Sequence, residues 1–218
     1  MTNVSNVLSV LEKQEEVLVK SFHEGSENTT TTVERGKILS RMNRILFDYQ
    51  IGAETNSSML GSVLNQKVVL FNPETKQKVL ELSYNRFPFL CKVFPKQFVR
   101  CVSASSTESQ SIGSIQQRIG LSRSCYDVYN SQYEHTYTLI LRKSYLRSKI
   151  QHRMSEYEIL DQNKTNIIGR ICPFSTDIER SQYGQATSIK FPQDMTMEMK
   201  ATLVVAVLVL VCICRNKV

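Results

Sequence analysis

The feature that most constrains the fold is an apolar run near the end of the chain. Residues 201–214 read A-T-L-V-V-A-V-L-V-L-V-C-I-C, with Lys200 before the run and Arg215 and Lys217 after it. A helix that is hydrophobic on every side must be surrounded by protein or by lipid. At the usual helical rise this run spans roughly 21 Å, which is short of the roughly 30 Å hydrocarbon core of a bilayer. The sequence predicts a helix here and leaves two interpretations open, a core-filling helix and a membrane segment. The residues that would line either one are Leu203, Val204, Val207, Leu208 and Val211.

The rest of the chain consists mainly of short strand patterns separated by turn signals. We predict strands over residues 16–22, 44–49, 67–71, 78–82, 97–102, 111–116, 125–130, 135–142, 156–160, 166–172 and 187–191. The sequences N-P-E-T-K at 72–76 and D-Q-N-K-T at 161–165 are typical of hairpin connections. The first residues are ambiguous, because residues 7–11 also fit one face of a helix. This spacing predicts a mainly β, antiparallel barrel or sandwich within a single domain over residues 1–218, and a barrel would give the apolar helix a place to lie.

The charge of the chain points to anionic partners. The formal net charge is +7 and the isoelectric point is about 9.1, which suits nucleic acid, a membrane surface, or an ordinary cytosolic protein with excess Lys and Arg. Residues 1–9 lack the basic and apolar regions of a secretory signal peptide. We therefore expect the six cysteines to be reduced thiols and the sequons at Asn3, Asn28, Asn56 and Asn163 to remain unmodified.

No motif for covalent chemistry stands out. The sequence contains no G-x-S-x-G, P-loop, H-E-x-x-H or G-x-G-x-x-G pattern. Asp127 and His135 have no nucleophile at a suitable spacing, and we expect ordinary surface roles for both. The prediction is a protein that is not an enzyme.

Two segments near the end of the chain carry motifs of a known protein family. Residues 157–171, Y-E-I-L-D-Q-N-K-T-N-I-I-G-R-I, are similar to a strand, turn and strand that carry V-G-R-I or V-G-K-I in the phospholipid scramblase family. The family frame F-P-x-D-x-x-x-x-M-K-A is matched at Phe191, Pro192, Asp194, Met199, Lys200 and Ala201. The resemblance implies a tubby-like fold, in which a closed antiparallel barrel of about twelve strands surrounds a hydrophobic C-terminal helix.

The resemblance also implies calcium as a cofactor, bound by an Asp-rich segment just before this frame. In residues 183–194 the only carboxylate is that of Asp194, and Lys190 opposes a bound cation. Calcium takes six to eight oxygen ligands, and charge sets the affinity. Together with Gln185, Thr187 and Ser188, Asp194 would make at best a weak calcium site.

The resemblance also implies two clusters of palmitoylated cysteines. Most of these cysteines are missing from this sequence. Cys91 stands at one matching place, and Cys212 and Cys214 lie at the end of the apolar run, where they are either acylation candidates or packing residues. The second cluster is replaced by a basic stretch, which either binds anionic lipid or is a solvated loop. Its candidate lipid-binding residues are Arg142, Lys143, Arg147, Lys149 and Arg153.

These features predict a scramblase-like protein that promotes ATP-independent, bidirectional movement of phospholipids across a bilayer. We expect it at the cytoplasmic face of a membrane, in the first place the plasma membrane, with anionic lipids and further copies of the chain as partners. The alternative is a soluble tubby-like module in the cytoplasm or nucleus that binds anionic headgroups without transport. Nucleic acid is poorly supported as a partner, because only Tyr145 interleaves with the basic stretch.

Overall fold

The computed structural model describes residues 8–22, 34–56, 63–86, 97–101, 110–119, 124–141, 156–173 and 186–215. This part of the chain forms twelve strands, the short 3-10 helix η1 (Ser9–Leu11) and the long helix α3 (Met197–Arg215). The strands are β1 (Glu16–Phe22), β2 (Glu34–Ser40), β3 (Ile45–Asn56), β4 (Val63–Phe71), β5 (Lys78–Arg86), β6 (Gln97–Cys101), β7 (Gln110–Ile119), β8 (Ser124–Asn130), β9 (His135–Leu141), β10 (Tyr157–Leu160), β11 (Ile167–Pro173) and β12 (Ala186–Lys190). The prediction of a mainly β, antiparallel protein with a C-terminal helix is confirmed.

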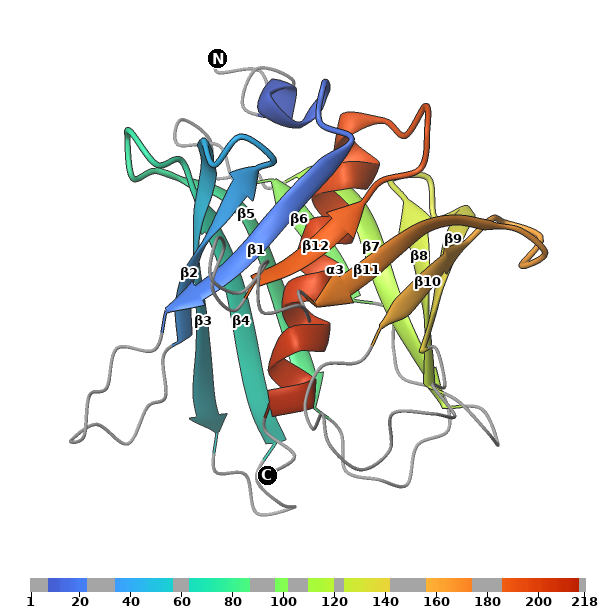
Figure 1. Cartoon of the computed structure of the whole chain (residues 1–218). Coiled ribbons are helices and arrows are strands. Elements are labelled where there is room, and N and C mark those ends of the chain that lie inside the picture. Colours follow the sequence, from blue (N-terminus) through green and yellow to red (C-terminus); the bar gives the residue numbers. More distant parts are fainter. Residues whose placement is uncertain are drawn as a thin grey trace, which may run out of the picture.

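The strands pair with their sequence neighbours in one antiparallel sheet. β1 pairs with β2 on one side and with β12 on the other, so the hydrogen-bonded order returns to its first strand as a closed barrel. In the joining register Val17 lies opposite both Ser40 and Ile189. Figure 1 shows the strands standing around α3, with η1, the β2–β3 turn and the start of α3 at one end of the molecule.

Helix α3 carries the apolar run into the core of the molecule. Leu203, Val204, Val207 and Leu208 are all 0% exposed. Val211 lies in the same helix, but its side chain is outside the described part. Among the described residues, no helix is long and apolar enough to cross a membrane. In this structure the side chains of residues 201–210 of the apolar run pack inside the sheet.

Helix α3 begins at Met197 rather than at the predicted residue 201, because Thr196 caps its first turn. The Thr196 carbonyl accepts a hydrogen bond from the Lys200 amide at 2.9 Å, and its hydroxyl accepts one from the Met199 amide at 3.4 Å. A hydroxyl at this position satisfies an amide that the helix itself leaves unpaired. Glu198 in the first turn adds a negative charge at the positive end of the helix dipole.

Strand β2 is the element that the sequence pattern missed. Its sequence E-R-G-K-I-L-S contains Gly36, which weakens a strand pattern in isolation. In the fold Gly36 lies opposite Tyr49, and a Cβ at Gly36 would stand 2.4 Å from the Tyr49 ring. The aromatic ring therefore covers the glycine, an arrangement that stabilises a strand only after β3 has paired with it.

Helix α3 packs tightly against β7 at Gly113. A Cβ on Gly113 would lie 2.5 Å from the Thr202 hydroxyl oxygen and 2.8 Å from the Tyr129 carbonyl oxygen. The Thr202 hydroxyl itself donates to the Glu198 carbonyl at 2.9 Å, so the one hydroxyl of the apolar run is satisfied within the helix. The absence of a side chain at Gly113 is what lets Thr202 and β7 approach.

Candidate functional site

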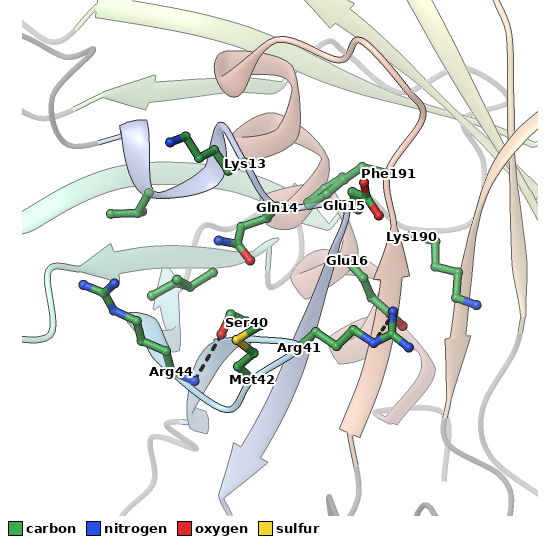
Figure 2. Close-up of a pocket in the computed structure, with 12 residues that line it drawn as sticks. Lys13, Gln14, Glu15, Glu16, Ser40, Arg41, Met42, Arg44, Lys190 and Phe191 are labelled. Atoms are coloured by element: carbon green, nitrogen blue, oxygen red, sulfur yellow. Dashed lines mark hydrogen bonds and ion pairs between the residues drawn. The ribbon is translucent and has the colours of Figure 1, made fainter.

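A hollow of about 740 Å³ lies at the end of the barrel where η1, β1, the β2–β3 turn and β12 meet. We call it the rim hollow (Figure 2). Its wall combines an apolar floor with charged side chains, and its residues come from three separate parts of the sequence. The residues that line it are Val10, Lys13, Gln14, Glu15, Glu16, Ser40, Arg41, Met42, Arg44, Leu46, Lys190 and Phe191.

Cations outnumber carboxylates in the rim hollow. Four of the lining side chains are basic and two are acidic. The Nε of Arg41 is 4.0 Å from a carboxylate oxygen of Glu16, and the Arg41 side chain is still 82% exposed. The other Glu16 oxygen accepts a hydrogen bond from the Ser188 hydroxyl. Arg41 is therefore paired only loosely with Glu16, and its exposure leaves it accessible to an anionic ligand.

The cationic surface continues across the neighbouring strands. Lys190 lies opposite Glu16 on β1 and opposite Arg170 on β11. Both basic residues are exposed. Figure 2 shows Lys13, Arg44 and Lys190 arranged around the hollow, with Arg41 and Met42 between them. The rim therefore presents positive charge on several sides.

The β2–β3 turn projects Met42 from the rim. The turn is fixed by the Ser40 amide, which donates to the Arg44 carbonyl at 2.8 Å, and by the Ser40 hydroxyl, which accepts from the Arg44 amide at 3.1 Å. Asn43 has a φ of 61°, a conformation that Asn adopts more readily than most residues. Met42 is 94% exposed at the tip of this ordered turn.

The base of the rim hollow is held by the family frame. Lys200 is 7% exposed, and its ammonium group donates to the carbonyls of Leu11 at 3.2 Å, Glu12 at 2.7 Å and Gln14 at 2.8 Å. It also lies 5.6 Å from the centre of the Phe191 ring, within the range of a cation–π contact. Burial lowers the pKa of Lys200, against the opposite effect of the nearby carboxylates. Lys200 thus ties the start of α3 to the segment that follows η1.

Asp194, the candidate calcium ligand, belongs to the same family frame. It is exposed in the turn between β12 and α3, with a φ of 58°. On β12, Ile189 belongs to the core, so Thr187 shares its face, whereas Ser188 faces the other way and binds Glu16. The Thr187 and Ser188 side chains therefore point to opposite faces of β12, and Gln185 lies outside the described residues. Among the described residues there is no group of three or more His, Cys, Asp and Glu side chains that could hold a metal ion.

A second polar cluster lies on the outer face of β7, β8 and β9. Its centre is Asp127, which is 1% exposed, so the predicted surface role of this residue is wrong. Its neighbours Tyr126 and Val128 point into the core, and Asp127 points to the other side of the sheet. The reason it is buried is that long polar side chains cover it. Lys164 from the β10–β11 turn approaches it at 3.4 Å, Arg118 on β7 forms an ion pair with it, and Thr138 on β9 donates to it at 2.9 Å.

The charges of this cluster fix the protonation of Asp127. Burial alone would raise the pKa of Asp127, but hydrogen bonds from Arg118 and Thr138 and the charge of Lys164 outweigh it, so the pKa lies below its usual value. His135 is 3.5 Å from the same carboxylate, and burial lowers the pKa of this imidazole. The partners of this carboxylate come from β7, β9 and the β10–β11 turn, so the cluster is suited to joining these elements.

The remaining predicted site residues lie largely outside the described part. This applies to Cys91 and to the basic residues Arg142, Lys143, Arg147, Lys149 and Arg153, which remain predictions. Cys212 and Cys214 belong to α3, but their side chains are not described. Sequence reasoning missed the rim hollow. The available signal was R-M-N-R at 41–44, an apolar residue between two arginines in a turn.

The comparisons with known proteins agree with the resemblance of the motifs. No curated protein and no solved structure matches the chain significantly. A family model described as Scramblase matches residues 1–212 of the 218 residues. This match includes all twelve strands and most of α3, and therefore both the rim hollow and the frame that supports it. The chain belongs to the scramblase family.

Proposed function

We propose that this protein promotes ATP-independent, bidirectional movement of phospholipids between the leaflets of a bilayer. The observation that carries the proposal is the family match over residues 1–212. We place the protein at the cytoplasmic face of a membrane, in the first place the plasma membrane. Lipid translocation without covalent chemistry is consistent with the character of the family.

The geometry supports contact with phospholipids at the barrel rim. The rim hollow offers Arg and Lys side chains, which bind phosphate groups through charge-assisted hydrogen bonds. Transport itself requires a polar headgroup to pass a hydrocarbon core of about 30 Å, where unpaired polar groups are expensive. Oligomers, local thinning of the bilayer, or movement of α3 out of the barrel would each lower that barrier.

The accessory features of the family are separate proposals. Calcium control through Asp194 would use at most one of the Thr187 and Ser188 side chains, since those two side chains face opposite sides of β12. Palmitoylation of Cys91, Cys212 or Cys214 and lipid binding by the basic residues between Arg142 and Arg153 rest on the sequence. Single acyl chains anchor proteins only weakly, so these features would act together with other membrane contacts.

The test is a lipid-scrambling assay with purified protein in liposomes that carry a fluorescent lipid in both leaflets. Dithionite added outside bleaches only the outer leaflet, so bleaching well past half of the signal in intact vesicles would support transport. Protein-free liposomes and a leakage test on the same vesicles are the controls. Bleaching that stops near half, with and without calcium, would overturn the proposal. It would then favour the alternative, a lipid-binding module without transport.

A further inference from the structure

We propose that the rim hollow and the projecting Met42 form a docking surface for anionic phospholipid bilayers, in which cations bind lipid phosphates and Met42 enters the acyl-chain region. The inference rests on the proposed membrane function and names the surface that makes the contact. The occupant is a bilayer surface rather than a soluble anion.

The first observation is the exposure of Met42. Its side chain is 94% exposed, although it sits on an ordered turn that is held by the backbone and hydroxyl of Ser40. Val10 on η1 is 37% exposed and lines the same hollow. Two of the five exposed large hydrophobic residues in the described part of the chain therefore lie at one hollow. Apolar groups gathered in this way on a surface indicate a binding site for protein or membrane.

The second observation is the charge beside these apolar side chains. Arg41 and Arg44 flank Met42 in the turn, and Lys13 and Lys190 stand on the other elements around the hollow (Figure 2). Two carboxylates, Glu15 and Glu16, offset part of this charge. Each basic residue near an anionic bilayer adds to the affinity. Arginine in particular binds phosphate oxygens through two parallel hydrogen bonds.

The combination distinguishes a bilayer from the other anionic partners. A free phosphate or headgroup would use the cations but would gain nothing from the exposed Met42. A single-stranded nucleic acid would stack its bases on aromatic side chains, and the only aromatic residue that lines the rim hollow, Phe191, is 8% exposed. A lipid surface places phosphates and hydrocarbon side by side, which matches the adjacent Arg and Met side chains of this turn.

The test is co-sedimentation with phosphatidylcholine vesicles, with and without phosphatidylserine. We expect binding to vesicles that contain phosphatidylserine and a loss of binding as salt is raised. Met42→Asp should weaken this binding by about tenfold or more, because it removes an inserting side chain and adds a repelled charge. Met42→Leu should retain the affinity of the unmodified protein. Arg41→Gln with Arg44→Gln should weaken binding by about tenfold.

Two matched variants delimit the surface. Tyr133→Asp adds the same charge to the β8–β9 turn, on the opposite side of the ring, where Tyr133 is 55% exposed. Lys76→Gln with Lys78→Gln removes two exposed cations at the β4–β5 turn. Both should bind like the unmodified protein. Normal vesicle binding by Met42→Asp, or an equal loss of binding in Tyr133→Asp, would overturn the assignment. Release of the protein from vesicles by soluble phosphoserine would also overturn it.

The outcome is separable from that of the proposed function. The same variants are reconstituted for the dithionite assay. Scrambling by the unmodified protein together with vesicle binding that is insensitive to Met42→Asp would keep the proposed function and reject the docking surface. Vesicle binding that depends on Met42, in the absence of scrambling, would keep the docking surface and reject transport.

Discussion

The barrel interior and the outer face of β8 both exclude water, but they do so by opposite means. Inside, residues 203–210 of α3 present only apolar side chains to the strands, and Val207 is 0% exposed. Outside, the carboxylate of Asp127 is 1% exposed because Arg118, Thr138 and Lys164 cover it. The interior depends on the absence of charge and the outer cluster on the balance of charge. A change of charge should therefore be severe in the first region and moderate in the second.

The largest effect is expected for Val207→Asp. This substitution places a carboxylate in the core without a partner, which should cost more than about 4 kcal/mol and prevent stable folding. Soluble yield without detergent and denaturant-induced unfolding measure the loss. Met42→Asp is the matched control, because it introduces the same carboxylate at a position that is 94% exposed. A Val207→Asp protein that unfolds at the same denaturant concentration as Met42→Asp would show that α3 does not occupy the core.

The second-largest effect is expected for a substitution of Lys200, the buried lysine near the start of α3. Lys200→Met keeps an unbranched side chain, one atom shorter, but removes the donor to the three carbonyls of Leu11, Glu12 and Gln14. The free energy of unfolding should fall by about 3 kcal/mol, because buried carbonyls lose a charged partner. Urea denaturation measures it, and Lys78→Met, at an exposed lysine, is the control. Equal stability of the two variants would remove Lys200 from this role.

A smaller effect tests how closely α3 packs against the sheet. Gly113→Ala would put a methyl group 2.5 Å from the Thr202 hydroxyl oxygen, so α3 or β7 must shift, at about 1–3 kcal/mol. Gly52→Ala is the matched control, because nothing lies within 4 Å of a Cβ there, and its change should stay within about 0.5 kcal/mol. The midpoints of thermal unfolding of Gly113→Ala and Gly52→Ala measure the difference. Equal midpoints would mean that the contact between α3 and β7 is looser than this structure has it.

The smallest effect is expected for Asp127→Asn. Arg118 and Lys164 are 41% and 39% exposed and can turn to solvent, so the loss at pH 7 should be about 1–2 kcal/mol. Because the folded protein lowers the pKa of Asp127, its contribution is present above the unfolded value of about 3.9 and disappears as the pH falls through the folded value. The difference between the two proteins should therefore shrink from pH 7 to pH 3 in urea titrations. Glu74→Gln, at an exposed turn, is the control, and a gap that widens in acid would contradict the assignment.

The contrast also shows which parts of the fold can be predicted from the sequence. The strand pattern predicted β1 with the bounds that the structure has, and both expected hairpin turns are present between β4 and β5 and between β10 and β11. Those turns are local: the Asn72 side-chain oxygen accepts the Glu74 amide at 2.9 Å, and the Asp161 side chain accepts the Thr165 amide at 2.9 Å. Such bonds join residues that are close in the sequence, so these turns can be recognised from their residue types.

The candidate site could not be predicted in the same way, because it depends on how strands that are far apart in the sequence pair with one another. Glu16 meets Lys190 only when β1 pairs with β12, and Gly36 becomes a strand residue only under the ring of Tyr49. Likewise, Asp127 is covered by Lys164 from another hairpin. Periodicity describes which face of a strand is buried, but it does not state which strand lies beside it.

The position of α3 in the chain has a consequence for how the protein folds. All twelve strands precede the helix that fills them, and β1 must wait for β12 before the ring of hydrogen bonds is complete. During synthesis the strands therefore emerge before their core exists, with apolar faces and an open edge exposed. Such intermediates fold slowly and aggregate easily. A ribosome-bound chain that stops before Met197 should consequently depend on chaperones, whereas a chain that includes α3 should fold cooperatively.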